Sequence, residues 1–398
     1  MRLPSPPDVH LTYCQNIHPG ESWTQHHEAI QNKATAVRDS LNCTAPFGLG
    51  LRISAQAADE LASPEALLSG ETLFSTEKLY PFSINGFPFG RFHRGPVKEN
   101  VYAPDWRTPE RLHYTVQLAR ILARWLPPGL EGSISTVPGS FAQWIQSESD
   151  QQSLAENLGR IVVELVHLER HTGRCIHVGL EPEPDCFLET TLQTVRFFEG
   201  PLAAHAVPLI QNKIQVSQQA AEALLRRHLG VCFDTCHAAL QYENLTESLQ
   251  TYQKAGILIS KIQLSAALKA PAHPDSYRAL QRFAEPTYLH QVKARTSSGE
   301  RVAWTDLPVA LNELPVTRDL EELRVHFHVP LFLSPQTPLE STADALDSHF
   351  WALLRGGICC HLEIETYTFD VLPLEVRPNN LIESIVSEYR WVLDQLCD

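Results

Sequence analysis

An aspartate and a histidine three residues apart are the strongest chemical signal in this sequence. They are Asp234 and His237, within the segment Gly230-Val-Cys-Phe-Asp-Thr-Cys-His237. Residues 231–233 are apolar and typical of a buried strand, and a helical pattern begins at Cys236, so both side chains are expected on the turn between them. In parallel α/β folds this turn lies at the carboxyl edge of the sheet, where ligands bind. The turn is therefore the predicted centre of a functional site.

Three other predicted strands carry acidic or amide side chains, which are Glu181, Gln263, and Glu363 or Glu365. Burying a charge at the end of an apolar strand is unfavourable unless the charge is paired or bound to a cation. Side chains alternate along a strand, so Glu363 and Glu365 point the same way, and Glu365 is nearer the carboxyl end. We therefore predict one divalent cation, bound by Glu181, Asp234, Gln263 and Glu365.

All four predicted ligands offer oxygen atoms. This donor set suits Mg²⁺ or Mn²⁺ better than zinc, which favours nitrogen and sulfur ligands and stays the alternative. Glu181 and Glu365 could each act as ligand or as catalytic base, and His237 as hydrogen-bond donor, catalytic proton shuttle or further ligand. Other interpretations are open: Asp234 could be a helix N-cap, and Gln263 could hydrogen-bond within the barrel. Glu183 is expected to be solvated beyond the end of its strand.

Four further histidines are predicted to bind substrate, namely His93, His290, His326 and His328. His326 and His328 alternate with Val325 and Phe327, so they share one face of a strand. They could contribute two imidazoles to the site or lie on the solvent side of an edge strand. The loop at 86–93 could cap a small ligand or pack its aromatic rings internally, through Phe87, Phe89 and Phe92.

Strand and helix patterns alternate along the whole chain. Predicted strands lie at 8–14, 47–53, 79–85, 133–137, 177–184, 231–233, 261–265 and 360–366, and helical patterns lie at 23–41, 55–68, 109–125, 152–172, 188–198, 217–228, 236–240, 245–255, 343–354 and 381–396. Eight such units without an internal repeat predict a (β/α)8 TIM barrel that forms one domain over residues 1–398. The number of barrel strands is eight only if residues 324–330 form an accessory strand outside the barrel. We therefore expect an insertion or lid at about 270–330.

The overall composition narrows the choice of partner and compartment. The chain has 398 residues, 43% of them hydrophobic, and a formal net charge of −14, so a packed core is expected and nucleic acid is a poor candidate partner. Nine scattered cysteines fit reduced thiols in a cytoplasmic protein. The N-terminal segment 1–7 has no apolar core, and no apolar run approaches the roughly 18 residues of a membrane span.

The segment from Gly230 to His237 resembles a strand and turn of the xylose-isomerase-like (AP endonuclease 2-type) TIM-barrel superfamily. That superfamily includes sugar isomerases, epimerases, dehydroshikimate dehydratases and endonuclease IV. Gly179-Leu-Glu181 and Ile364-Glu-Thr366 resemble its first and last metal-binding glutamates, which implies a metal-binding role for both. Most members carry histidine where this chain has Gln263, and Val137 stands where the endonuclease has another histidine. Both departures disfavour a trinuclear zinc nuclease.

Over nearly its whole length the chain is similar to a narrower group, the EboE metabolite-traffic proteins. The resemblance is carried by His10-Leu-Thr-Tyr-Cys14, Asn16-Ile-His-Pro-Gly-Glu21, Asn85-Gly-Phe-Pro-Phe-Gly90, Gly179-Leu-Glu-Pro-Glu-Pro-Asp-Cys186, Phe283-Ala-Glu-Pro-Thr-Tyr-Leu-His290 and His361-Leu-Glu-Ile-Glu-Thr-Tyr-Thr368. It implies a bacterial gene-cluster protein that helps to move or finish a biosynthetic precursor, with other proteins of the cluster as partners.

Three hypotheses of function follow from these residues. The first is a metal-dependent isomerase, epimerase or dehydratase that acts on a small polyol, keto or hydroxy compound. The second is a barrel that binds or hands over a metabolite without catalysis. The third, a nuclease like endonuclease IV, is disfavoured by the acidic charge and by Gln263.

Overall fold

The computed structural model describes residues 1–3, 8–93 and 95–397. The N-terminal segment for which we expect no targeting sequence therefore lies partly outside the described residues, at 4–7.

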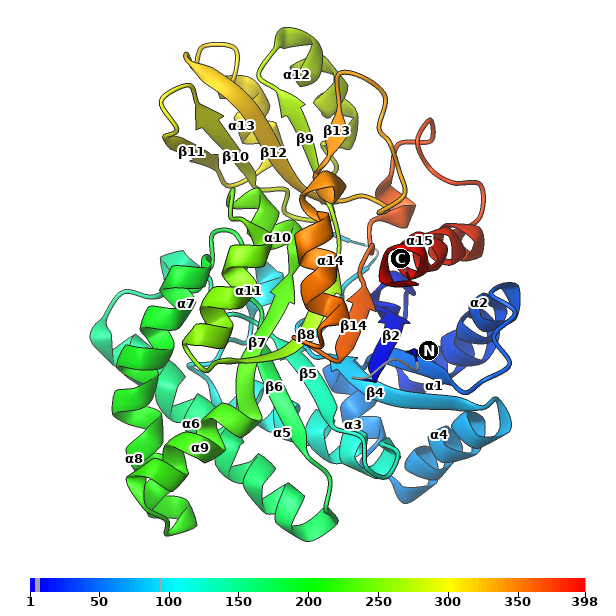
Figure 1. Ribbon diagram of the computed structural model, residues 1–398, viewed down its shortest axis with the longest axis vertical. Coiled ribbons are helices and arrows are strands. Elements are labelled where there is room, and N and C mark those ends of the chain that lie inside the picture. Colours follow the sequence, from blue (N-terminus) through cyan, green and yellow to red (C-terminus); the bar gives the residue numbers. More distant parts are fainter. Residues whose placement is uncertain (4–7, 94, 398) are drawn as a thin grey trace.

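A barrel of parallel strands forms the centre of the fold (Figure 1). Within the described residues the barrel consists of eight parallel strands: β2 (Val9–Tyr13), β3 (Phe47–Arg52), β4 (Leu79–Asn85), β5 (Gly132–Thr136), β6 (Ile176–Leu180), β7 (Leu229–Asp234), β8 (Leu258–Leu264) and β14 (His361–Ile364). The short strand β1 (Arg2–Leu3) runs antiparallel to β2. This arrangement is a (β/α)8 TIM barrel, so the predicted fold class is confirmed.

The barrel closes between β2 and β3 through side-chain contacts. An isolated parallel bridge joins Cys14 to Gly50. Beside it, Thr12 Oγ1 accepts a hydrogen bond from Gly50 N at 2.8 Å and donates one to Gly48 O at 3.1 Å. A Cβ atom at residue 50 would lie 2.7 Å from Thr12 Cγ2 and 2.9 Å from Glu363 Oε2, so only glycine fits this junction.

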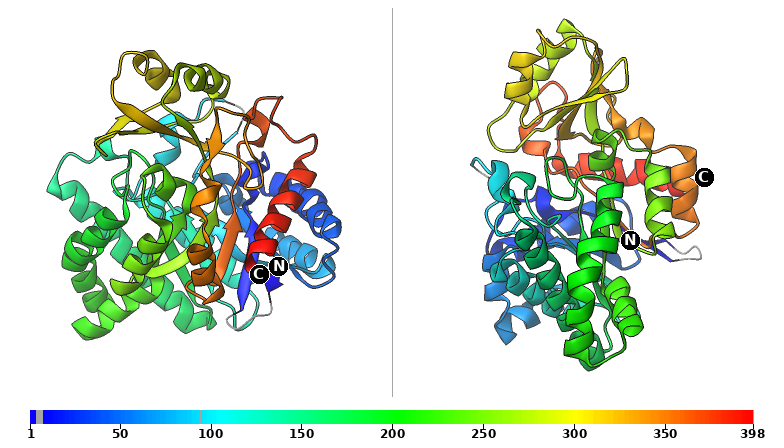
Figure 2. Two further views of the ribbon diagram at one scale, coloured as in Figure 1. Left: turned by 45° about the horizontal axis from the view of Figure 1, so that its top comes forward. Right: turned by 90° about the vertical axis from the view of Figure 1, so that its left-hand side faces the viewer.

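Helices surround the barrel (Figure 2). They are α1 (Trp23–Ala29), α2 (Thr35–Ser40), α3 (Ala55–Glu60), α4 (Pro64–Thr76), α5 (Pro109–Trp125), α6 (Glu148–Thr172), α7 (Thr191–Phe197), α8 (Ala203–Ile214), α9 (Gln218–His228), α10 (Thr235–Leu240), α11 (Leu245–Lys254), α14 (Ser348–Arg355) and α15 (Leu381–Cys397). Ser63 caps α4 and Pro64 is its first residue, so the predicted helical segment 55–68 is divided between α3 and α4. Helix α8 was not predicted, because Pro208 lies inside it and Pro201 lies in the helical segment just before it.

A second, antiparallel sheet lies between β8 and β14 in the chain. It contains β9 (Ala267–Pro271), β10 (Val292–Thr296), β11 (Arg301–Trp304), β12 (Leu320–His328) and β13 (Glu340–Ser341), with the helices α12 (Pro274–Leu280) and α13 (Leu307–Glu313). Figures 1 and 2 show this sheet at one end of the barrel, above β7 and β8. Strand β12 pairs with β10 on one side and β9 on the other, so His326 and His328 do not lie on an edge strand.

The structure also bears on the predicted state of the cysteines and on membrane spans. All cysteines whose side chains the structure describes are free thiols, as expected. Among the described residues, no helix has both the length and the apolar character that a membrane span requires.

A buried carboxyl group fastens α15 to the end of the barrel, and it should make stability depend on pH. Glu388 Oε1 accepts hydrogen bonds from Leu331 N at 3.1 Å and Thr366 Oγ1 at 2.7 Å, and burial raises the pKa of Glu388 to about 7. Its stabilising contribution is complete below its unfolded-state pKa of about 4.5 and is lost as pH rises through about 7.

Replacing Glu388 with glutamine keeps the accepting oxygen and removes the ionisation. At pH 8 we expect the free energy of unfolding of Glu388→Gln to exceed that of the wild type by on the order of 2–3 kcal/mol. This difference should vanish near pH 4.5. Urea unfolding of both proteins at several pH values between these two limits measures the difference in free energy. A difference that stays constant with pH would show that the residue does not titrate in this range.

Candidate metal centre

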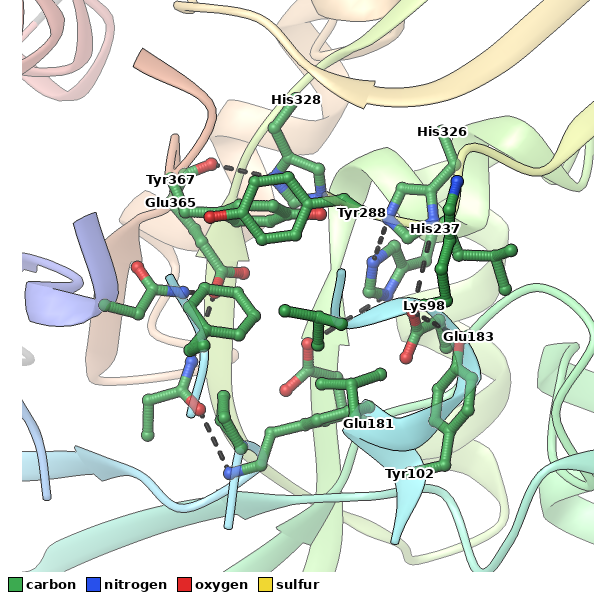
Figure 3. Close-up of a pocket in the computed structure, with 18 residues that line it drawn as sticks. Lys98, Tyr102, Glu181, Glu183, His237, Tyr288, His326, His328, Glu365 and Tyr367 are labelled. Carbon is green, nitrogen blue, oxygen red and sulfur yellow. Dashed lines mark hydrogen bonds and ion pairs between the residues drawn. The ribbon is translucent and has the colours of Figure 1, made fainter. Parts of the chain in front are cut away.

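A pocket opens at the carboxyl end of the barrel, beneath the inserted sheet (Figure 3). It encloses about 530 Å³ of empty space, including the part open to solvent. One wall carries titratable side chains: Glu181, Glu183, His237, His326, His328 and Glu365. The other lining residues are largely apolar or aromatic and include Phe87, Phe92, Val101, Tyr288, Leu289 and Tyr367, whose ring centroid lies 4.7 Å from that of His328.

Three buried carboxylates meet at the base of this pocket, and two of them, Glu181 and Glu365, line it. Glu181 follows β6, Asp234 ends β7, and Glu365 follows β14, and each offers an oxygen within 4.8 Å of the other two. The ends of parallel strands bring these residues together although they are far apart in the chain. The structure thus groups three of the four predicted metal ligands.

Asp234 uses its two oxygens differently. Its Oδ1 accepts hydrogen bonds from Cys236 N at 2.7 Å, His237 N at 3.1 Å and Ser265 Oγ at 2.6 Å. Its Oδ2 is buried and has no hydrogen-bond partner among the described residues. The N-cap interpretation is therefore correct for Oδ1, and Oδ2 is left available for a ligand, so the metal-binding role of Asp234 stays a proposal.

Two asparagines hold Glu365 in place. Asn16 Nδ2 donates to Glu365 Oε1 at 2.7 Å, and Asn85 Nδ2 donates to the same oxygen at 3.1 Å. Sequence reasoning missed both donors. Asn85 is the last residue of β4. A polar side chain at the end of a strand is the signal that identified Glu181, but asparagine in that place is also a common turn residue.

The carboxylate cluster fits a hard divalent cation. Burial, followed by repulsion from neighbouring carboxylates, raises the pKa of Glu181 and of Glu365 well above the usual range. In the described part of the chain, Glu181 Oε2 and Asp234 Oδ2 are buried without a hydrogen-bond partner. A cation would satisfy these oxygens and relieve the repulsion, and an all-oxygen donor set suits Mg²⁺ or Mn²⁺.

Gln263 lies beside this cluster but not on the pocket wall. It is fully buried on β8, in register with Asp234 and Glu363. Cys232 Sγ donates to its Oε1 at 2.9 Å, and its Nε2 has no partner within the residues that the structure describes. To bind a cation, Gln263 Oε1 would have to give up its hydrogen bond from Cys232. Metal binding by Gln263 therefore stays a proposal.

Glu363 and Glu365 have separate environments. Glu365 lines the pocket, whereas Glu363 lies inside the barrel. There, Glu363 Oε2 accepts hydrogen bonds from Lys261 Nζ at 2.8 Å and from Ser83 Oγ at 3.1 Å.

Only two of the four predicted substrate-binding histidines line the pocket, namely His326 and His328. His93 and His290 are buried, and each has both ring nitrogens in hydrogen-bonding contacts. His93 contacts Asn16 O at 2.6 Å and Tyr288 Oη at 3.0 Å. His290 contacts His326 O at 2.8 Å and Glu285 Oε1 at 2.9 Å. These two histidines therefore hold pocket segments in position, and substrate contact by them stays a proposal.

Glu183 is buried on the pocket wall, so the expectation that it is solvated was wrong. It is 6% exposed, and Tyr102 Oη donates to its Oε1 at 3.0 Å. Burial raises the pKa of Glu183 to about 8. The flanking prolines 182 and 184 resemble an exposed loop in sequence, and no local pattern indicates that Tyr102 covers the carboxyl group.

The residues of the aromatic loop lie in two different environments. Phe87 and Phe92 line the pocket. Phe89 instead packs against Tyr114, with ring centroids 5.1 Å apart in an edge-to-face arrangement. Part of the loop therefore faces a ligand space and part fastens the loop to α5.

Neither a protein-family model nor a curated protein matches the chain. Among solved structures, a xylose isomerase-like TIM-barrel protein from Mycobacterium smegmatis in complex with magnesium aligns over 99% of this chain and 98% of its own, with TM-score 0.53 and 10% identity. The chain has this xylose isomerase-like fold. The IolI protein with a bound zinc atom aligns at TM-score 0.48 and 12% identity, covering 98% of each chain.

The probable 3-DHS dehydratase AsbF from Bacillus anthracis aligns at TM-score 0.43 and 11% identity, covering 97% of this chain and 99% of its own. The likeness to the Mycobacterium smegmatis protein agrees with the predicted fold. None of the comparisons confirms the narrower resemblance to EboE proteins, which stays a prediction.

Within this xylose isomerase-like barrel the pocket combines two kinds of surface. The carboxylates and imidazoles can bind a cation and exchange protons with an oxygenated group. The aromatic and apolar lining residues can hold the remainder of a small molecule and exclude water from it. The arrangement suits proton transfer on a small ligand.

Proposed function

We propose that this protein is a divalent-metal-dependent isomerase, epimerase or dehydratase that acts on a small oxygenated metabolite. The observation that carries the proposal is the convergence of three buried carboxylates, Glu181, Asp234 and Glu365, next to the separate buried carboxyl group of Glu183. Buried acids with perturbed pKa values in one pocket are typical of acid–base chemistry.

The carboxylates would hold the cation. Glu181, Asp234 and Glu365 are the proposed ligands, with Gln263 as a fourth. A bound divalent cation would polarise substrate oxygens and stabilise negative charge beside a carbonyl. Asn16 and Asn85 would keep Glu365 oriented, because both donate to its Oε1.

Glu183 is our candidate for moving the proton. Its pKa of about 8 keeps it largely protonated near neutral pH, so it can donate a proton, and its ionised fraction can accept one. The hydrogen bond from Tyr102 orients the carboxyl group toward the pocket. Sequence reasoning gave catalytic roles to Glu181, Glu365 and His237. With Glu181 and Glu365 holding the cation, His237 and Glu183 remain on the pocket lining to exchange a proton, and we place Glu183 first because its pKa is the one near neutral.

The biological setting in this proposal is that of EboE metabolite-traffic proteins, with other proteins of the gene cluster as partners. The sequence resemblance supports it. A net charge of −14 and a pocket for small ligands favour a metabolite over nucleic acid. A cytoplasmic location is part of the same proposal and agrees with the free thiols.

Solvent-deuterium exchange tests the reaction type. The protein loaded with Mg²⁺ or Mn²⁺ is incubated in D₂O with a panel of hydroxy-carbonyl compounds, and exchange at the carbon next to the carbonyl is followed by mass spectrometry. We expect metal-dependent exchange with at least one compound. Glu183→Gln should lower its rate by about 10²- to 10⁴-fold and leave the metal content unchanged.

A protein that carries its metal and exchanges no proton would instead support the non-catalytic binding barrel. Exchange at the wild-type rate in Glu183→Gln would remove Glu183 from the reaction and return the proton transfer to another group.

A further inference from the structure

A second group of metal-ligating side chains lies at the end of the barrel opposite the pocket. It consists of Glu169 on α6, Cys175 directly before β6, and His228 at the end of α9, and each offers a ligand atom within 4.8 Å of the other two. We propose that Glu169, Cys175 and His228 bind one divalent ion of the zinc type. This site is independent of the reaction proposed above.

Strand β6 separates this group from the carboxylate cluster. Cys175 precedes the first residue of β6 and Glu181 follows its last one, so the two residues lie about 20 Å apart along the strand. Helices α6 and α9 pack against each other at this end of the barrel, away from the inserted sheet (Figure 1). The proposed ion would therefore join two helices and a strand, outside the pocket.

The orientation of His228 is that of a metal ligand. Its ring is fully buried, and its Nδ1 lies 2.8 Å from Ile176 O, a carbonyl oxygen that can only accept a hydrogen bond. Nδ1 therefore carries the proton, and in a neutral ring Nε2 is left with a lone pair. Nε2 is buried and has no hydrogen-bond partner in the part of the chain that the structure describes. Metal-binding histidines commonly donate their other ring N–H to a backbone carbonyl in this way.

A carboxylate oxygen faces His228 Nε2. Glu169 Oε2 lies 3.2 Å from this nitrogen, without a hydrogen bond between them. A neutral ring puts a nitrogen lone pair against a negative oxygen, which is unfavourable in a buried place unless a cation lies between them. Nitrogen and oxygen ligands of one tetrahedral zinc ion lie about 3.4 Å apart. The observed separation is therefore close to the one that a shared ion requires.

Arg227 orients the Glu169 carboxylate and leaves room for an ion. Its Nη2 donates to Oε1 at 2.6 Å and its Nε donates to Oε2 at 3.1 Å. A carboxylate oxygen has two lone pairs, so Oε2 can accept from Arg227 and still bind a metal. Carboxylates that bind metals are commonly held by such additional hydrogen bonds.

Cys175 completes the donor set and balances its charge. The residue is 7% exposed, and burial raises the pKa of its thiol to about 12, so the thiol is neutral without a metal. A bound ion would displace the thiol proton, since the thiolate is the form that binds metals. The thiolate, Glu169 and the neighbouring Glu131 would then carry three negative charges and Arg227 one positive charge. This net charge of −2 matches a divalent cation.

The donor atoms and the exposure of the group favour zinc over Mg²⁺. Sulfur and nitrogen ligands select zinc and similar transition metals, whereas Mg²⁺ takes oxygen ligands. The side chain of Glu169 is 27% exposed and that of Glu131 is 53% exposed, so an ion can enter from solvent on this side. Water or Glu131 would fill the fourth position of a tetrahedral site.

The alternative to a metal is an imidazolium that pairs with Glu169. Protons on both ring nitrogens of His228 would satisfy Ile176 O and Glu169 Oε2. Burial opposes this charge and lowers the pKa of His228 below its ordinary value. The ion pair also makes no use of Cys175, so the state of this thiol distinguishes the two interpretations.

Cobalt binding tests the proposal, because a cobalt–thiolate bond gives a near-ultraviolet charge-transfer band that oxygen and nitrogen ligands do not give. Metal-free protein is titrated with Co²⁺. We expect the band in the wild type and at equal intensity in Glu181→Gln/Glu365→Gln, which removes two ligands of the carboxylate cluster. Cys175→Ser should abolish the band, and Glu169→Gln should weaken cobalt binding by about 10-fold or more.

Cys360→Ser is the matched control. Cys360 is a half-buried cysteine at the same end of the barrel, directly before β14, and it does not belong to the ligand group. This variant should keep the full cobalt–thiolate band. No band in the wild type, or a band of unchanged intensity in Cys175→Ser, would overturn the proposal and favour the imidazolium.

Zinc-edge X-ray absorption gives a second measurement that leaves the site intact, in case the Cys175 variant does not fold. Glu181→Gln/Glu365→Gln protein saturated with Zn²⁺ should show a zinc–sulfur distance of about 2.3 Å. Scattering from oxygen and nitrogen alone would contradict the assignment. Neither measurement depends on turnover, so the proposed reaction can fail while this site stands, and this site can fail while the reaction stands.

Discussion

Replacing Glu365 with glutamine is expected to make the metal-free protein more stable and to abolish the carboxylate metal centre. Glutamine keeps an Oε1 that can accept from Asn16 and Asn85, so the local hydrogen bonds survive. It removes a negative charge that burial and the neighbours Glu181 and Asp234 disfavour, which should add about 1–2 kcal/mol to the free energy of unfolding without metal.

The same substitution removes one of the proposed ligands. We expect the affinity of the carboxylate centre for Mn²⁺ to fall by about 100-fold or more, since even changes outside the direct ligands cost 10- to 100-fold. Turnover should be lost with the metal. Calorimetric Mn²⁺ titration and thermal unfolding, each with and without metal, measure both effects.

Asp234→Ala provides the contrast. It also removes a proposed ligand, but it deletes the Oδ1 cap of α10 and should destabilise the metal-free protein by about 1 kcal/mol or more. We expect Glu365→Gln to raise the stability of the metal-free protein and Asp234→Ala to lower it, while both variants lose the metal. This result would show that Asp234 has a structural role as a helix cap in addition to the metal-binding role that it shares with Glu365. Unchanged metal content in both variants would eliminate the carboxylate centre.

The barrel and its carboxylates were predictable because each depends on a local signal. Apolar runs followed by helical periodicity identified the strands, and Glu181 and Asp234 stand directly at strand ends. Parallel strands bring such residues to one end of the barrel whatever their separation in sequence. The convergence of Glu181, Asp234 and Glu365 follows from topology alone.

The surroundings of the carboxylates were not predictable, because they depend on contacts between distant segments. Glu183 is buried by Tyr102, which is 81 residues away in the chain. His326 is oriented by Gln291 and its carbonyl is held by His290, and both contacts lie within the inserted sheet region. The loops that supply these residues have little periodicity, so their pairings have no signature in the sequence.

A second large effect is expected inside the barrel, at the ion pair between Lys261 and Glu363. Both side chains are fully buried, and Lys261 Nζ lies 2.8 Å from Glu363 Oε2. Burial disfavours the ammonium, but Glu363 outweighs this and holds the pKa of Lys261 above its ordinary value. Lys261→Met leaves an uncompensated buried carboxylate with only Ser83 as its described side-chain donor, and should cost about 3–5 kcal/mol of stability.

The Lys261→Met/Glu363→Gln variant tests whether that loss arises from the unpaired charge. Glutamine can accept from Ser83 and carries no charge, so the double variant should recover most of the lost stability. Urea unfolding of the wild type, both single variants and the double variant gives the coupling energy between the residues. A double variant as unstable as Lys261→Met would mean that the packing of the lysine chain, rather than its charge, holds β8 against β14. Because Glu365 lies two residues after Glu363, just beyond the end of β14, a recovered double variant should also regain the metal affinity of the carboxylate centre.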